Sequence, residues 1–284
     1  MNIIQSLKGL FVKRSPKKKL LGVALGSGGA KGMAHLGALK AFEEENIAFN
    51  CFAGTSIGSI VGGLCAYGYT TDELKEVVLN ICLKQYVRYL RPYMDMTFIE
   101  DVLNEYLKDA TFSSLSLPFY AWATDKQSMQ GVLLQSGKVA RACTASSAVP
   151  PYFHSVDIDG KELIDGAYTN SIPADVLRER GADFILGIDL NAGVRNENDR
   201  YARNVITRIL SDTLDSTVKI TTAKDATERG YRACDVMLQP SLAIYTPLDG
   251  GRLSLEEMYE IGYITAREQM SFVKEKLREV LHRA

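Results

Sequence analysis

The fold class follows from residues 20–67, which read LLGVALGSGGAKGMAHLGALKAFEEENIAFNCFAGTSIGSIVGGLCAY. A short apolar run over 20–25 predicts a fully buried strand, and the glycine-rich loop after it leads into a helical pattern over 33–45. A second apolar run near 49–53 predicts another strand, followed by a turn and a helix over 57–67. Two successive strand–turn–helix units predict an α/β domain with a parallel sheet.

The rest of the chain continues the mixture of strands and helices without a clear linker, so a single domain over 20–284 is expected. Helical patterns cover 71–107, 141–148, which ends at Pro150-Pro151, and the amphipathic stretch 255–278. Further strands are predicted at 117–124, 131–134, 161–164, 184–190 and 236–238.

Composition excludes several classes of protein. The chain has 284 residues, of which 46% are hydrophobic and 24% charged, as in a soluble globular protein rather than a disordered or coiled-coil one. Its net charge of -1 argues against nucleic acid as a partner. The five cysteines are widely spaced and never form C-x-x-C, so neither a metal knuckle nor a disulfide framework is predicted. This cysteine usage and the lack of a signal-peptide pattern predict a cytoplasmic protein.

One uncharged stretch, residues 47–71, is long enough to cross a bilayer. However, it contains five glycines and the polar pair Thr55-Ser56. A strand, a sharp turn and a buried helix explain this pattern better than a membrane span does.

The first nineteen residues form a segment of a different kind. They carry only positive charges, and five apolar residues fall at helical spacing among them: Ile3, Ile4, Leu7, Leu10 and Phe11. Such a segment could lie in a membrane interface, attracted by anionic headgroups, which would make the protein peripheral to the inner face of a membrane. A free basic tail and a helix packed on the body are the alternatives.

A candidate nucleophile lies in Gly54-Thr55-Ser56-Ile57-Gly58, which matches G-x-S-x-G. In this motif a serine on a tight strand-to-helix turn exposes its hydroxyl at the start of the helix. The context is right, because an apolar strand precedes the turn and a helix follows it. The alternative is an ordinary glycine-rich crossing from a strand to a helix.

The glycine-rich loop Gly26–Gly32 fits neither nucleotide-binding fingerprint. Lys31 stands where G-x-G-x-x-G requires glycine, and no Ser or Thr follows that lysine as a P-loop would require. What remains is a group of backbone N–H donors at the start of a helix, suited to a phosphate or a developing oxyanion. A turn without a ligand is the alternative.

The base that would activate Ser56 is less clear from the residues alone. The chain has three histidines: His35 precedes the serine on the helix after the glycine loop, His154 breaks the usual hydrolase order, and His282 is almost terminal. A carboxylate is the better hypothesis, and Asp165 before Gly166 is the best candidate. The alternative reading of Asp165 is a turn aspartate of the common Asp-Gly type.

Three motifs in this order resemble the patatin-like phospholipase family, in particular the bacterial branch related to neuropathy target esterase. They are Gly28-Gly29-Ala30-Lys31-Gly32, the elbow around Ser56, and Asp165-Gly166-Ala167. The resemblance covers roughly residues 20–275. It implies a three-layer α/β/α fold with a mostly parallel central sheet.

The same resemblance implies roles for individual residues. Ser56 would be the nucleophile and Asp165 the base, and the backbone amides of Gly28, Gly29, Ala30, Lys31 and Gly32 would form an oxyanion hole. No metal and no cofactor is implied.

The expected function is therefore a serine acyl hydrolase that cleaves phospholipids or lysophospholipids through an acyl-enzyme. An acyltransferase, a thioesterase and a lipid-binding protein without turnover are the alternatives. The aromatic and methionine-rich residues 86–98 could line an acyl-chain pocket or act as a lid, although such residues are more often core. The oligomeric state is not predicted by the sequence.

Overall fold

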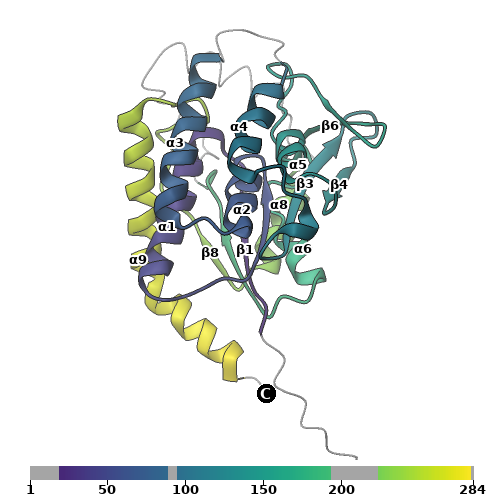
Figure 1. The fold of residues 1–284 in the computed structure, drawn as a ribbon. Helices are drawn as coiled ribbons and strands as arrows, with labels where there is room; N and C mark the ends of the chain where they lie inside the picture. The colour runs from purple at the N-terminus through teal and green to yellow at the C-terminus, as the bar shows by residue number, and fades with distance from the viewer. Residues whose placement is uncertain (1–18, 89–94, 193–222, 283–284) are drawn as a thin grey trace, which may run out of the picture.

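A mixed β-sheet forms the middle layer of the computed structural model, which describes residues 19–88, 95–192 and 223–282 (Figure 1). The strands lie in the order β5-β6-β3-β2-β1-β7-β8, and β4 pairs with β3 off this path. Their bounds are β1 Leu21–Leu25, β2 Cys51–Thr55, β3 Phe119–Asp125, β4 Gly131–Leu134, β5 Val156–Ile158, β6 Lys161–Asp165, β7 Phe184–Ile188 and β8 Val236–Leu238.

The sheet is mostly parallel, which confirms the predicted fold class. Strands β3, β2, β1, β7 and β8 run parallel to one another, whereas β4 and β6 are antiparallel to β3, and β5 is antiparallel to β6. The strand predicted over 184–190 ends earlier, at Ile188. Strand β5 was not predicted, because three residues are too few to establish an alternating pattern.

Helices flank the sheet on both faces. Their bounds are α1 Met33–Glu44, α2 Ile57–Tyr67, α3 Thr71–Arg88, α4 Thr97–Leu107, α5 Val139–Ser146, α6 Ala174–Glu179, α8 Ala223–Ala233 and α9 Arg252–His282, with short 3-10 turns η2 Gly29–Gly32, η3 Phe112–Ser114 and η4 Gly166–Tyr168. The helical pattern predicted over 71–107 is thus two helices, α3 and α4. The last helix is longer at both ends than the predicted 255–278.

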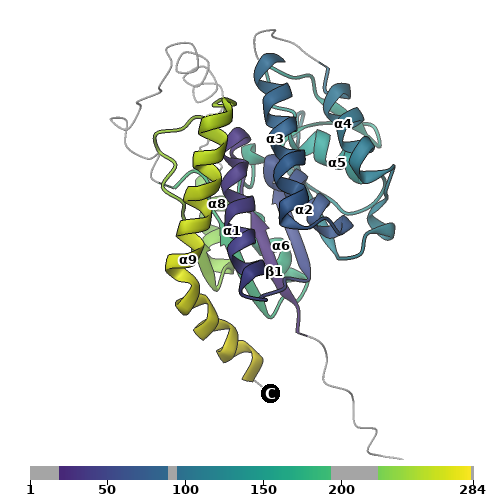
Figure 2. The same ribbon diagram turned by 60° about the vertical axis from the view of Figure 1, so that its left-hand side comes forward.

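Alternate residues of each central strand enter two different cores, as a sheet covered on both faces requires. In β1, Val23 and Leu25 join the larger core with α1, α2 and α9. Ala24, between them, joins a smaller core with residues of α6 on the opposite face. The result is the predicted three-layer α/β/α arrangement, with the sheet in the middle (Figure 2).

Helices α1 and α9 lie side by side along much of their length (Figures 1 and 2). Glycines make the approach possible: a Cβ on Gly37 would lie 1.9 Å from the carbonyl oxygen of Tyr259, and one on Gly262 would lie 2.1 Å from that of Ala34. Real Cβ atoms do not approach backbone oxygens so closely. Gly37 and Gly262 therefore set the spacing of this helix pair.

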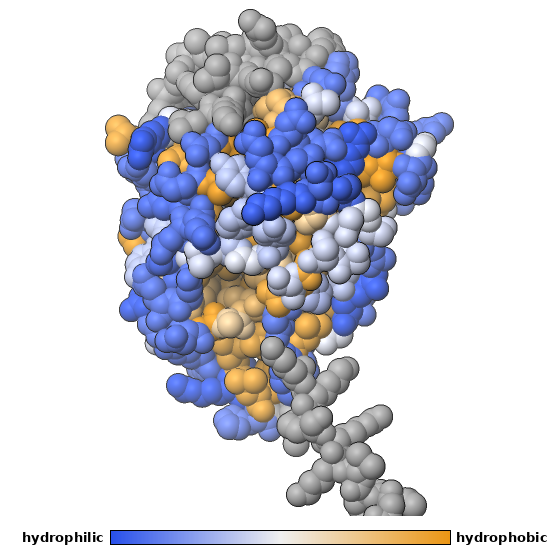
Figure 3. Space-filling view, viewed as in Figure 1, coloured by the Kyte–Doolittle hydropathy of each residue, from blue (hydrophilic) through white to orange (hydrophobic). Residues whose placement is uncertain are grey.

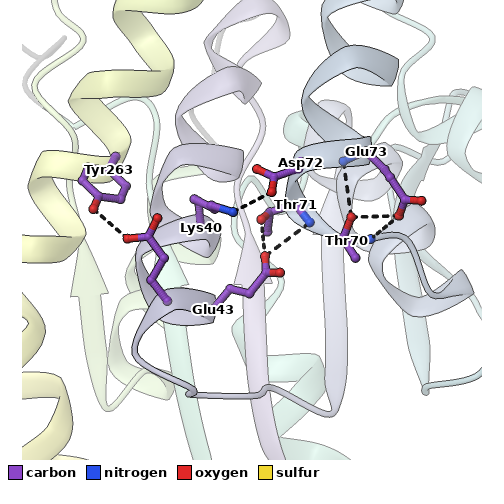
Figure 4. A network of polar contacts seen from close by, with 8 residues as sticks. Lys40, Glu43, Thr70, Thr71, Asp72, Glu73 and Tyr263 are labelled. Atoms are coloured by element: carbon purple, nitrogen blue, oxygen red, sulfur yellow. Dashed lines mark hydrogen bonds and ion pairs between the residues drawn. The ribbon is translucent and has the colours of Figure 1, made fainter.

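Polar contacts tie the end of α1 to its neighbours (Figure 4). Lys40 pairs with Asp72 at 2.7 Å, and the Thr71 hydroxyl donates to Glu43, so that α1 is joined to the start of α3. On the other side, the Tyr263 hydroxyl of α9 donates to a Glu44 carboxylate oxygen at 2.7 Å. These contacts lie at the exposed end of α1, far along the helix from the glycine loop that precedes it.

Hydrophilic residues cover most of the face seen in Figure 1, with apolar residues gathered in its lower part (Figure 3).

Stretch 47–71 is the predicted strand, turn and buried helix, because β2 and α2 fall within it. Over the described ranges, no helix combines the length and the apolar character needed to cross a bilayer. Residues 1–18 of the basic segment predicted over 1–19 lie outside the described residues.

The five cysteines are free thiols. Cys51, Cys82 and Cys143 are buried, whereas Cys65 and Cys234 are half-buried. Burial raises the pKa of Cys51 to about 11 and that of the other four thiols to about 12. These thiols are therefore protonated at neutral pH.

Candidate active site

The glycine loop and the G-x-S-x-G turn lie next to each other at one edge of the sheet. They follow β1 and β2, which are adjacent and parallel, with Leu25 paired to Gly54. Both turns therefore leave the carboxyl edge of the sheet, where ligands of open α/β sheets bind. A Cβ on Gly32 would lie 2.2 Å from Cγ1 of Ile57, so the end of the glycine loop packs directly against the start of α2.

The backbone of Ser56 has the sharp conformation of a nucleophile elbow. Its φ of 56° and ψ of -127° lie in a region of backbone conformation that residues with a side chain rarely adopt. The flanking glycines permit this turn, since a Cβ on Gly54 would lie 2.2 Å from the Gly58 carbonyl oxygen. A Cβ on Gly58 would lie 2.2 Å from the Leu25 carbonyl oxygen, on the neighbouring strand. The elbow predicted from the motif is confirmed as a local structure.

Asp165 lies beside Ser56 although more than a hundred residues separate them. It is the last residue of β6 and is paired with Ala123 of β3. A Cβ on Gly166 would lie 2.1 Å from the Trp122 carbonyl oxygen and 2.9 Å from the Thr55 methyl group. The Asp-Gly pair therefore packs closely against the residues that precede the elbow serine.

The two candidate groups interact: the Ser56 hydroxyl, as a hydrogen-bond donor, lowers the pKa of the Asp165 carboxyl. The Ala167 N–H donates to Oδ1 of Asp165 at 2.8 Å. Both side chains are buried, Asp165 with 2% and Ser56 with 8% of its surface exposed. Burial raises the pKa of Asp165 to about 6, and the two hydrogen bonds oppose this rise only in part.

Ser146, at the end of α5, holds the elbow from behind. The Ser56 N–H donates to Oγ of Ser146 at 2.9 Å, and that hydroxyl donates in turn to the Trp122 carbonyl oxygen at 2.6 Å. This hydroxyl thus accepts one hydrogen bond and donates another, and it fixes the Ser56 backbone. No role for Ser146 was predicted from the sequence; a serine in a helical stretch with few charged residues was the available signal.

The N–H groups of the glycine loop divide into two sets. Those of Ala30 and Lys31 donate to the carbonyl oxygens of Pro247, at 2.8 Å, and Gly28, at 3.2 Å. Those of Gly28 and Gly29 have no acceptor among the described residues. Of the five amides predicted to bind an oxyanion, those of Ala30 and Lys31 thus already have backbone acceptors.

Lys31 points its ammonium group back under the loop. It is 2% exposed, and Nζ donates to Oδ1 of Asn191 at 3.0 Å and to the Leu190 carbonyl oxygen at 3.5 Å. Asn191 follows β7, so this lysine joins the glycine loop to the next parallel strand of the sheet. Asn191 was not singled out from the sequence, although its place just after a buried strand was visible.

His35 does not contact Ser56 in the structure. It is fully buried on α1, and Nε2 donates to the Gly26 carbonyl oxygen at 2.8 Å. Burial lowers the pKa of His35 to about 4, so the ring is neutral and supports the loop. His154 is exposed in the loop before β5, and His282 ends α9.

Of the aromatic and methionine residues in 86–98, Met96 and Phe98 have described side chains, and both pack into the larger core. Met96 is 2% exposed, and the Phe98 ring lies 6.2 Å from that of Phe153. Tyr89, Tyr93 and Met94 lie outside the described residues, and the lid stays a prediction. Within the described ranges, no group of three or more His, Cys, Asp or Glu side chains gathers as metal ligands would.

Comparisons with known proteins agree with the motifs. The family model described as Patatin-like phospholipase matches residues 23–178, just over half of the chain. The mouse patatin-like phospholipase domain-containing protein 6 is 25% identical over 86% of this chain. An NTE family protein of Mycobacterium tuberculosis is 28% identical over 74% of this chain. The chain spans 20% of the mouse protein and 59% of the mycobacterial one.

A solved structure agrees in fold. VipD from Legionella pneumophila superposes with a TM-score of 0.50 and 12% identity, over 90% of this chain and 67% of that one. The matched family segment runs from β1 to α6 and includes the glycine loop, the elbow and the Asp-Gly pair. The chain belongs to the patatin-like phospholipase family.

Proposed function

We propose that this protein is a serine acyl hydrolase that cleaves ester bonds of phospholipids or lysophospholipids, with Ser56 as nucleophile and Asp165 as base. The observation that carries the proposal is that the buried Ser56, at a strained elbow, lies close enough to the buried Asp165 carboxylate for its hydroxyl to lower the pKa of that carboxylate. Family membership supports the lipid substrate class.

In the first step, Asp165 takes the Ser56 proton while Oγ attacks the ester carbonyl carbon. The carbonyl π bond opens and leaves a negative charge on its oxygen. The unpaired Gly28 and Gly29 N–H groups are the donors for that oxygen, a role in which one donor is typically worth about 10²–10³ in kcat. Collapse of the tetrahedral intermediate expels the alcohol, which takes the proton from Asp165, and leaves an acyl-serine.

In the second step, water replaces the alcohol. Asp165 takes a proton from the water as its oxygen attacks the acyl carbon, and the same two N–H groups receive the new oxyanion. Collapse breaks the bond to Oγ, Ser56 regains its proton from Asp165, and the fatty acid leaves. His35 hydrogen-bonds to the glycine loop rather than to Ser56, and in this proposal one carboxylate serves as base and acid in both steps.

The test is intact-mass analysis after treatment with a fluorophosphonate, on the wild type and on Ser56→Ala. One adduct on the wild type and none on the variant are expected, since only an activated serine is phosphonylated. A panel of phospholipids and lysophospholipids, presented in detergent micelles, then identifies the substrate.

Asp165→Asn is the second variant, because it keeps the shape of the side chain and removes the base. We expect slow phosphonylation and a loss of ester hydrolysis comparable to that of Ser56→Ala. Product analysis with an added alcohol acceptor distinguishes hydrolysis from acyl transfer. A folded wild type that is neither phosphonylated nor active on any lipid, with or without micelles, would refute the proposal.

A further inference from the structure

The side chain of Asn191 bridges two points of the glycine loop. Its Nδ2 group donates to the Ser27 carbonyl oxygen at 2.9 Å, and its Oδ1 accepts from Nζ of Lys31 at 3.0 Å. Its own N–H donates to Oδ1 of the buried Asp189 at 2.9 Å, which fixes the asparagine at the end of β7. One amide group thus contacts the residues on both sides of the unpaired Gly28 and Gly29 N–H groups.

The contact with Ser27 bears directly on the Gly28 N–H. The Ser27 carbonyl and the Gly28 N–H belong to the same peptide group, which is planar, so holding the oxygen also aims the hydrogen in the opposite direction. Without that contact, a peptide between a serine and a glycine can rotate easily, because glycine restricts its neighbouring dihedrals least.

The peptide groups on either side are held by other partners. The Gly26–Ser27 peptide is held at both ends, by His35 on the carbonyl oxygen and by the Ser171 carbonyl oxygen on the N–H, at 3.0 Å. The Gly28–Gly29 peptide is held at its oxygen by the Lys31 N–H. Among the described residues, Asn191 is the partner that holds the Ser27–Gly28 peptide.

We propose that Asn191 is a positioning residue of the acyl transfer steps, which aims the Gly28 N–H at the oxyanion by holding the Ser27 carbonyl oxygen. The inference rests on the proposed function, since it assigns a task within the oxyanion hole. Asn191 itself touches neither the substrate nor Ser56 in this role.

Asn191→Asp separates its two contacts. An aspartate has the same shape and accepts from Lys31 with the added attraction of opposite charges, but it has no hydrogen to donate to Ser27. Asn191→Leu removes both contacts. If the Ser27 contact matters, both variants lose activity to a similar extent.

The measurements are kcat and KM for a p-nitrophenyl ester and the inhibition constant of a trifluoromethyl ketone, whose adduct with serine carries an oxyanion. For both variants we expect kcat to fall by about tenfold to 100-fold. This fall does not exceed the one expected when a whole oxyanion-hole donor is removed. KM should change little, because the contact is used in the transition state, and the inhibition constant should rise in parallel with the loss of kcat/KM.

Asn50→Asp is the matched control. Asn50 also bridges two backbone groups, accepting from the Leu21 N–H at 2.8 Å and donating to the Lys19 carbonyl oxygen at 3.0 Å, but at the opposite end of β1. This control should lose thermal stability to a similar extent and keep kcat. The stoichiometry of phosphonylation after long incubation counts the folded molecules of each variant.

The outcomes are distinguishable. If Asn191→Asp keeps the wild-type kcat while Asn191→Leu loses it, the Lys31 contact is the important one and the proposal is wrong. If Asn50→Asp loses as much kcat as Asn191→Asp, the effect is one of general stability and the proposal is also wrong. A wild type inert to both the ester and the fluorophosphonate would refute the proposed function, and this inference with it.

Discussion

Asp165 combines two demands that oppose each other at the level of the single residue. A base must be ionised, yet Asp165 is 2% exposed, and an ionised carboxylate in such a place loses its hydration. Two hydrogen bonds, from Ser56 and from Ala167, favour the charged form. Burial is the larger effect, and the pKa of about 6 leaves the carboxylate ionised but more basic than a free one at neutral pH.

This pKa predicts the acid side of the pH profile. The kcat/KM for ester hydrolysis should rise with pH and level off above an apparent pKa of about 6, because the free enzyme needs Asp165 ionised. Steady-state rates measured between about pH 4.5 and 8 give this apparent pKa, because an ordinary carboxylate would already be ionised over most of that range. His154→Gln is the control, because it removes an exposed imidazole, and the inflection should survive the substitution. If the inflection vanished in His154→Gln, it would not come from Asp165, and this prediction would be wrong.

The same residue predicts a stability effect. The folded-state pKa lies above the unfolded value of 3.8, so the contribution of Asp165 is fully favourable below that value and is lost as pH rises through about 6. A difference of about two pKa units corresponds to about 3 kcal/mol. In urea unfolding, the stability of Asp165→Asn minus that of the wild type should therefore be greater at about pH 7.5 than at about pH 4, by about that amount. An equal difference at both pH values would contradict the buried-carboxylate account.

Sequence reasoning succeeds at the residue scale where a motif records a local conformation. The elbow could be predicted because glycines at 54 and 58 are required by backbone contacts two residues from Ser56. Asp165 needed the family resemblance, since Asp-Gly is a common turn and its contact with Ser56 is made across the sheet. Asn191 and Ser146 act through hydrogen bonds to the backbone, and no local pattern distinguishes them from other polar residues near strand and helix ends.

At the scale of elements, the α1–α9 pair depends on two glycines. Gly37→Ala and Gly262→Ala should each destabilise the protein by about 1–3 kcal/mol, because a methyl group would press on a carbonyl oxygen of the facing helix. Urea unfolding measures the change. Gly251→Ala is the control: its Cβ would meet nothing within 4 Å, and stability should hardly change. Alanine is the better helix former, so a stabilising effect at Gly262 would show that the helices can move apart at little cost.

Element prediction was good where a pattern is long or repeated, and poor where tertiary contacts decide. The first two strand–loop–helix units were placed closely, because their apolar strands and glycine turns are distinct. Strand β5 is three residues long and depends on pairing with β6. The antiparallel direction of β4 and β6 was likewise not visible, since period and composition do not encode the direction of a strand.

At the scale of the whole molecule, the basic N-terminal stretch predicts electrostatic attachment to anionic membranes. Removal of residues 1–18 should weaken cosedimentation with phosphatidylglycerol vesicles, most strongly at low salt, where charges are least screened. The cut leaves Lys19, whose ammonium group pairs with Asp183 at 3.5 Å and whose carbonyl oxygen binds Asn50. Neutral phosphatidylcholine vesicles are the control. Equal binding of both forms to the anionic vesicles would refute the attachment.

The raised pKa values of all five thiols have a practical consequence for chemical labelling. With pKa values of about 11 to 12, only about one thiol in 10⁴ or fewer is a thiolate at pH 7. An electrophile that attacks both sulfur and oxygen would therefore be chemoselective for an activated serine as long as the chain stays folded. Once the chain opens, the thiols react as well, so the same reagent counts active serines in the native protein and times its unfolding in a single mass spectrum.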